Sequence, residues 1–376
     1  MYDVVRILLI WLLCFLSVLL HELGHALGIM DSVDYLDAEG RPFEPQAETE
    51  TPTYSTGEWR IAFAEDFDNP NSWNMHLVDQ NLNPAKAGMP IVSATGFEEL
   101  KTMNPSLTES DVFLVNNTDK GEDGSGRNGK AFFVGKNVTD ALAEATFFGV
   151  SGLPVNSWEG DRFEGSHLQT AGMMSHRPYS NYTAFMEVEL AAMQDMGYDI
   201  DREAYFGHSV YKDGDVFTNE QGFFARNEEG TAYVEGKFSA VPLGIGLHIY
   251  GSKNTVTQAA DILTNGTGAT GVRVDGMQNT VVIPAATSIH ADGLQGNGIL
   301  IAYGRDQVVD QAGTVTANGE DGVGARFDFG SSSNGAADEY RGSYIRFKRD
   351  VAEGTGAIAE SWNEPLTDMQ IGRAHV

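Results

Sequence analysis

The stretch from His21 to Gly28 reads HELGHALG, and it decides how the rest of the chain is interpreted. Residues four apart lie on one face of an α-helix, so His21 and His25 can present imidazole nitrogens to one metal ion, with Glu22 beside it. This spacing is typical of a zinc-binding helix, where the metal lowers the pKa of a bound water and the glutamate takes its proton. Gly28 predicts that the helix ends in a left-handed turn, which glycine adopts without strain.

Two imidazoles leave at least one protein ligand of zinc to be found. A second informative run, SHLQTAGMMSHRPY, extends from Ser166 to Tyr179 and contains His167 and two adjacent methionines. The residues after it predict a helix that is capped at residue 180 or 181, is apolar on one face from Phe185 to Met196, and ends at Gly197.

Together these two blocks resemble the metzincin metalloproteases, in particular the leishmanolysin-like branch. The resemblance implies that His21, His25 and His167 bind Zn²⁺ and that Glu22 is the catalytic general base. It also implies that Met173 or Met174 forms the methionine turn beneath the metal. The sequence from Met196 to Tyr198 matches the end of the helix that closes such a domain.

Some assignments stay open. Most metzincins place the third ligand six residues after the second histidine, where this chain has Asp31, and an aspartate can bind zinc. His176 is a further alternative to His167. Ordinary core packing would also account for Met173 and Met174. Tyr179 is a candidate to stabilise the oxyanion, although tyrosines are often half-buried packing residues.

The ends of the chain depart from this family. Residues 7–20 form an apolar run that suits a signal-peptide core or a buried helix better than a membrane span, and we interpret it as a core helix or a misread gene start. Metzincins carry a sheet-and-helix half before the zinc helix, so we expect truncation at the front. The last six residues, IGRAHV, are what a common sequencing adapter would encode, and we expect the chain to be cut there too.

Gly-rich β sequence with a period of about 26 residues begins near Leu243. GLHIYGSKNTV at Gly246 and GVRVDGMQNTV at Gly271 are followed by looser copies at Gly298 and Gly324. Short Val, Ile and Thr strands at a fixed period predict a right-handed parallel β-helix, with an irregular β-sandwich as the alternative. This part resembles the passenger of bacterial autotransporters, whose outer-membrane barrel would lie beyond this chain. His248 and His290 are expected to face the surface.

We therefore expect an α+β metzincin-like protease fragment followed by an all-β parallel β-helix. The predicted domains are listed in chain order: a catalytic region over 1–205 (zinc helix 15–30, insertion 31–160, third ligand and closing helix 165–198), a connector over 206–240, repeats over 241–350 and a tail over 351–376. Within the catalytic region, residues 31–57 are expected to be a surface loop and residues 58–165 strands and hairpins over the cleft.

Composition limits the possible functions. The 376 residues carry 53 acidic and 24 basic side chains, a formal charge of −29, which disfavours binding to nucleic acid. The single cysteine, Cys14, allows no disulfide within the chain. The expected function is zinc-dependent hydrolysis of peptide bonds in protein or peptide substrates, secreted or at the surface of a Gram-negative bacterium. The alternatives are a noncatalytic surface adhesin with a protease-like remnant and a membrane-anchored β-helix.

Overall fold

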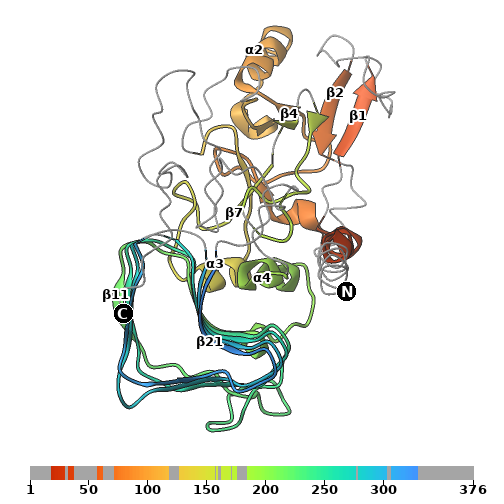
Figure 1. Cartoon of the computed structure of the whole chain (residues 1–376). Coiled ribbons are helices and arrows are strands. Elements are labelled where there is room, and N and C mark those ends of the chain that lie inside the picture. Colours follow the sequence, from red (N-terminus) through yellow and green to blue (C-terminus); the bar gives the residue numbers. More distant parts are fainter. Residues whose placement is uncertain are drawn as a thin grey trace, which may run out of the picture. The chain divides into compact units, whose positions relative to one another are not determined.

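The structure is a computed structural model of the whole chain. It describes residues 18–29, 33–37, 57–61, 72–117, 127–156, 158–159, 162–170, 172–175, 184–276, 278–302 and 306–328. Two compact units can be distinguished (Figure 1): unit 1 contains 1–140, 146–176 and 191–198, and unit 2 contains 141–145, 177–190 and 199–376. Within the described residues, no helix has the length and apolar character needed to cross a membrane.

Unit 1 combines short sheets with helices. Its described part starts with helical residues 18–26, which contain both histidines of the HELGHALG stretch. The later elements, in chain order, are β1 (Val33–Asp37), β2 (Gly57–Ile61), β3 (Leu77–Val78), β4 (Ile91–Val92), α2 (Ala94–Met103), β5 (Phe113–Leu114), β6 (Ala131–Phe133), α3 (Lys136–Leu142), β7 (Leu153–Val155), β8 (Trp158–Glu159), β9 (Arg162–Phe163) and α4 (Glu187–Asp195), with short 3-10 turns at Trp73–His76 and Glu109–Asp111. Residues 141–142 of α3 and 187–190 of α4 belong to unit 2.

The core of unit 1 forms around the antiparallel sheet β3-β6-β7. All residues of these three strands are buried, and the ring of Trp73 lies 4.4 Å from that of Phe133. Continuous apolar runs such as Ala131–Phe133 suit strands covered on both faces. The last residue of β7, Val155, bridges to Leu168, so this sheet contacts the segment that carries His167.

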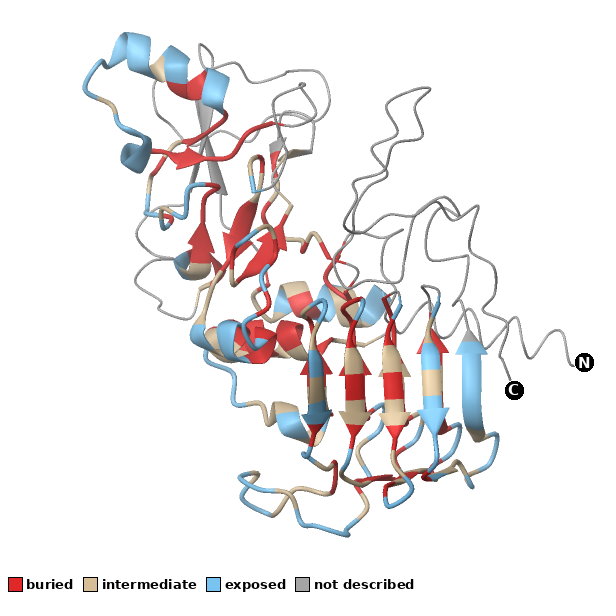
Figure 2. Ribbon diagram, turned by 90° about the vertical axis from the view of Figure 1, so that its left-hand side faces the viewer, coloured by how far each residue is buried: buried red, intermediate tan, exposed pale blue. Residues whose placement is uncertain are grey.

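Unit 2 contains three parallel sheets that the chain visits in a fixed order. The first sheet holds β10 (Phe206–Val210), β12 (Ile245–Ile249), β15 (Thr270–Val274), β18 (Asn297–Ala302) and β21 (Val323–Asp328); the second holds β11 (Val216–Asn219), β13 (Thr255–Gln258), β16 (Thr280–Ile283) and β19 (Val308–Gln311); the third holds β14 (Ile262–Thr264), β17 (Ser288–Ala291) and β20 (Thr314–Thr316). Figure 2 shows strands of this unit side by side, with burial strongest in the central ones.

The predicted repeat is the stacking unit of these sheets. Ile245 pairs with Thr270, Thr270 with Asn297, and Asn297 with Val323, offsets of 25, 27 and 26 residues. Inward-facing Val, Ile and Leu side chains from all three sheets form one core cluster, which includes Leu247, Val272 and Ile289. Because each repeat buries its apolar side chains against the next one, the sequence period and the layered core have the same origin.

Glycines occupy the same position in successive repeats and form a column in the first sheet, and the close approach of the neighbouring strand explains why. A Cβ built on Gly271 would lie 2.6 Å from the carbonyl oxygen of Gly298 and 2.4 Å from Cγ2 of Ile289. Equivalent close approaches occur at Gly246 and Gly298. No other residue type leaves room for the backbone of the neighbouring strand at this position, so the chain needs glycine there.

Polar side chains also form hydrogen bonds between successive repeats. The backbone N–H of Asn254 donates to Oδ1 of Asn279 at 2.9 Å, and the N–H of Asn279 donates to Oε1 of Gln307 at 2.9 Å. Asn254 and Asn279 are fully buried, so these side chains provide the turn between the first and second sheets with the hydrogen bonds that its backbone needs.

Several sequence-based expectations need correction. Residues 33–37 form strand β1, paired antiparallel with β2, within the stretch that was expected to be a loop. Helix α4 begins at Glu187, after Phe185 instead of before it. The parallel sheets start at Phe206, inside the expected connector, because β10 and β11 pair with β12 and β13.

His248 does not face the surface as expected. Its side chain is fully buried, and its Nε2 lies 2.5 Å from Oδ2 of Asp275. His290 is partly exposed and lies near Asp292, which agrees better with the expectation. The difference arises because β12 is buried on both faces, which a period-two pattern alone does not reveal.

Candidate metal centre

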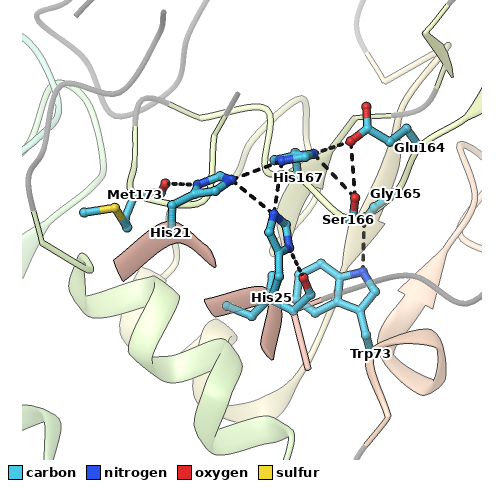
Figure 3. A network of polar contacts seen from close by, with 9 residues as sticks. His21, His25, Trp73, Glu164, Gly165, Ser166, His167 and Met173 are labelled. Carbon is cyan, nitrogen blue, oxygen red and sulfur yellow. Dashed lines mark hydrogen bonds and ion pairs between the residues drawn. The ribbon is translucent and has the colours of Figure 1, made fainter. Parts of the chain in front are cut away.

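Three histidines of unit 1 that are far apart in the sequence bring their rings together (Figure 3). His21 and His25 come from the helical residues 18–26, one turn apart, and His167 comes from the segment after β9. Their side-chain nitrogens form a cluster that could hold a metal ion, and no other group of three or more His, Cys, Asp or Glu residues in the described part of the chain does so.

The three Nε2 atoms form a nearly equilateral triangle. The distance is 3.1 Å between His25 and His21, 3.2 Å between His25 and His167, and 3.2 Å between His21 and His167. Three nitrogens bound tetrahedrally at ordinary zinc–nitrogen distances would lie about 3.3 Å apart. The geometry of the triangle therefore fits one face of a zinc tetrahedron.

The outer nitrogens determine which ring atoms carry hydrogens. His21 Nδ1 lies 2.8 Å from the carbonyl oxygen of Met173, and His25 Nδ1 lies 2.7 Å from that of Ile29. His167 Nδ1 contacts Oε1 of Glu164. Carbonyl and carboxylate oxygens accept hydrogen bonds, so each Nδ1 is the donor, and in the neutral ring each Nε2 then presents a lone pair. Three lone pairs facing one another at this distance repel unless a cation lies between them, and this donor set fits Zn²⁺.

Burial favours the neutral form of the His21 ring. Partial desolvation lowers the pKa of the His21 imidazole below its usual value, and the neighbouring His25 and His167 lower it further, against the opposing effect of the hydrogen bond to Met173. A lower pKa favours the neutral ring, which is the form that binds a metal.

The helix that carries His21 and His25 ends as the sequence predicts. Gly28 has a φ of 103°, its N–H bonds to the carbonyl of His25, and the N–H of Ile29 bonds to that of Gly24. This pair of bonds closes the helix C-terminus and reverses the chain. The reversal brings the Ile29 carbonyl back to His25 Nδ1, so the glycine also helps to orient a ligand.

The methionine pair lies in a turn close to the histidines. Met173 and Met174 are 1% and 0% exposed, and the carbonyl of Met173 is the acceptor for His21. The N–H of Leu168 bonds to the carbonyl of Met174 at 2.8 Å. This turn therefore contacts the site through its backbone, while its side chains pack in the interior.

The backbone around His167 is held by the insertion that precedes it. The N–H of Asn156 bonds to the carbonyl of His167 at 2.8 Å, and Leu168 bridges to Val155 at the end of β7. Nε1 of the buried Trp73 donates to the carbonyl of Gly165 at 2.9 Å. The insertion thus holds the backbone around His167 in place.

The residues after α4 contact the end of the helix that carries His21 and His25, within unit 1. Gly197 has a φ of 93° and ends α4 as predicted. Sδ of Met196 lies 4.0 Å from the position of a Cβ built on Gly28. The carboxylate of Asp195 accepts from the N–H groups of Asn137 and Val138 at the start of α3. The predicted closing sequence therefore lies beside the ligand helix.

The other predicted site residues have different outcomes. Glu22 is exposed on the ligand helix, next to His21. The alternative ligands Asp31 and His176 and the candidate oxyanion stabiliser Tyr179 lie outside the described residues. Sequence reasoning missed Glu164 and Trp73: Glu164 precedes His167 by three residues, a signal that was present, whereas Trp73 lies 92 residues from its partner Gly165.

We compared the chain with models of protein families, with characterised proteins and with solved structures, and none of the three comparisons found a match.

Proposed function

We propose that the chain is a zinc-dependent endopeptidase whose metal is bound by His21, His25 and His167. The observation that carries the proposal is the convergence of three Nε2 atoms whose rings each donate through Nδ1 to an oxygen acceptor. Three protein ligands that leave a fourth position open are typical of catalytic zinc sites, whereas structural zinc sites have four.

When bound, zinc would lower the pKa of a water molecule and polarise the scissile carbonyl. Glu22 directly follows His21 and its side chain is exposed, so a substrate can reach it. We assign it the role of general base, which takes a proton from the attacking water and delivers it to the leaving amine. The proposed substrates are proteins or peptides.

We further propose that residues 206–328 form a right-handed parallel β-helix that displays the protease outside a Gram-negative cell, as autotransporter passengers do. Support comes from the three parallel sheets, which the chain visits in the same order in the repeats that begin at β12, β15 and β18, and from their shared apolar core. In the alternative, a noncatalytic surface adhesin, the β-helix is present but the three histidines do not bind zinc.

The test is metal content by mass spectrometry, for the wild type and for His25→Ala, His167→Ala and a control, His290→Ala. His290 lies in unit 2, outside the cluster. We expect one zinc per chain in the wild type and the control, and loss in both site variants. Loss in His25→Ala alone would contradict His167 as the third ligand, and no zinc in the wild type would favour the adhesin.

The reaction is tested separately with Glu22→Gln on a casein substrate. We expect zinc content to be unchanged and cleavage to fall by about 10²-fold or more, because the amide cannot accept the proton. A variant that retains zinc and full activity would remove Glu22 from the mechanism.

A further inference from the structure

We propose that Glu164 is a positioning residue: it holds the His167 ring in the orientation and tautomer that aim Nε2 at the metal. The proposal deepens the proposed zinc site and rests on it for its functional meaning. The contacts of Glu164 are with residues of the chain itself, so its role can also be tested on the metal-free protein.

The contact between the two side chains is direct and sheltered. Oε1 of Glu164 accepts from Nδ1 of His167, and both side chains are 12% exposed. The hydroxyl of Ser166 donates to the same oxygen at 3.2 Å. In water this hydrogen bond would compete with solvent, but at this degree of burial it is electrostatically stronger.

Glu164 differs in kind from the partners of the other two rings. His21 and His25 donate to backbone carbonyls, which come with the fold and cannot be removed by a side-chain substitution. His167 donates to a carboxylate. The carboxylate both fixes the Nδ1–H tautomer and, through its charge, makes Nε2 a better donor to a divalent cation.

The backbone around His167 is held independently of Glu164. Trp73 bonds to the carbonyl of Gly165, Asn156 bonds to that of His167, and Leu168 bonds to that of Met174. These bonds fix where the Cα of His167 lies, but not how its ring turns about the side-chain torsions. The remaining freedom is rotation of the imidazole ring. The hydrogen bond from Nδ1 to Glu164 restricts this rotation, and the hydroxyl of Ser166 makes a longer contact of 3.4 Å with the same Nδ1.

This division of roles predicts a specific pattern of effects. Removing the carboxylate of Glu164 should leave the backbone around His167 folded and allow the imidazole of His167 to rotate. The amide oxygen of a glutamine can still accept from Nδ1–H but carries no charge, so Glu164→Gln should keep the tautomer and lose only part of the metal affinity. Glu164→Ala should lose both. A purely structural role would not separate the two variants in this way.

The experiment compares wild type, Glu164→Gln, Glu164→Ala and a control, Glu98→Gln, which changes an exposed glutamate on α2. Long-range ¹H–¹⁵N NMR on the metal-free proteins measures the tautomer of His167, assigned with His167→Ala. We expect Nδ1–H in the wild type, the control and Glu164→Gln, and a mixture of tautomers in Glu164→Ala.

Zinc affinity is then measured by competition with a chelator. We expect Glu164→Ala to bind zinc about 10–100-fold more weakly and Glu164→Gln to fall between it and the wild type, as is usual for the loss of a partner that orients a metal-binding histidine. Backbone amide spectra report whether each variant is folded.

An unchanged tautomer in folded Glu164→Ala, together with zinc affinity within about twofold of wild type, would overturn the proposal. If the wild type binds no zinc, the proposed function fails and the tautomer measurement alone decides the role of Glu164. If zinc binds as expected but no peptide is cleaved, the endopeptidase proposal fails and the positioning role stands.

Discussion

The hydroxyl of Tyr198 donates a 2.7 Å hydrogen bond to the carbonyl oxygen of Leu27, joining the chain after α4 to the last turn of the helix that carries His21 and His25. The carbonyls of a helix's last turn have no partner within the helix, so they need one from elsewhere. Tyr198 supplies it one residue before Gly28, at the point where the chain reverses.

Replacing Tyr198 with phenylalanine should destabilise unit 1 by about 1 kcal/mol, since one hydrogen bond is lost at a partly exposed position. Zinc affinity should change little, because the bond lies beyond both ligands of the helix. Denaturant unfolding checks the first expectation, with Tyr205→Phe as a control at a similarly exposed tyrosine. An equal loss in both variants would contradict a specific role for this bond.

Met173 and Met174 should tolerate leucine. Both side chains are buried, and the contact of Met173 with His21 uses its carbonyl oxygen, which the substitution retains. The two residues have similar volumes, so each variant should lose less than about 1.5 kcal/mol of stability. Zinc affinity should stay within about threefold, since the ligand's partner is still present.

Competition with a chelator measures the zinc affinity of Met173→Leu and Met174→Leu. A large loss of zinc affinity in a variant of normal stability would show that the sulfur atom itself contributes to the site, contrary to the backbone role described above.

Much of the repeat region could be predicted from the sequence because its period is fixed by contacts between neighbouring repeats. Gly246, Gly271, Gly298 and Gly324 lie one repeat apart, and the strands that contain them pair in parallel. The burial of His248 could not be predicted in this way, since it depends on what covers the outer face of β12, and a local pattern contains no information about that.

The candidate site also combines local features, which the sequence predicts, with long-range contacts, which it does not. The spacing of His21 and His25 and the turn at Gly28 are local features, so the sequence alone predicts them. The convergence of His167 depends on chain reversals over more than 140 residues, and only the family resemblance suggested it. Trp73 could not have been identified, because its role arises from one long-range hydrogen bond to a glycine carbonyl.

Unit 2 should lose stability as the pH falls from about 6.5 towards 4. Complete burial lowers the pKa of His248 to about 4, against the opposing effect of Asp275. Burial would raise the pKa of Asp275, but Arg273 and His248 more than offset this and hold it below its usual value. In this pH range the unfolded chain binds a proton at His248 and the folded chain does not, so protons favour unfolding.

Hydrogen exchange of the amides in β12 and β15, followed against pH, measures this dependence. His248→Asn should flatten it, whereas Asp275→Asn should keep it at a lower overall stability, because the histidine is still buried and has lost an attractive charge. An unchanged slope in His248→Asn would show that another group controls the acid sensitivity of this unit.

The glycine column offers a matched pair of substitutions at equivalent positions of two repeats. In Gly271→Ala the new methyl would meet the carbonyl of Gly298 at 2.6 Å and the side chain of Ile289 at 2.4 Å. At Gly324, in the last described strand, a Cβ meets nothing within 4 Å. Both variants add one methyl group to a glycine. A difference in stability between them therefore reports only how closely the neighbouring repeat packs.

Gly271→Ala should therefore destabilise unit 2 by about 1–3 kcal/mol or more, because a backbone atom cannot move aside as a side chain can. Gly324→Ala should be neutral or slightly stabilising, since alanine has less backbone freedom to lose on folding and φ is not positive at this position. Thermal unfolding of the two variants beside the wild type checks both expectations. If both variants were destabilised equally, these repeats would require glycine for its backbone conformation. Close packing between neighbouring repeats would then not be the reason.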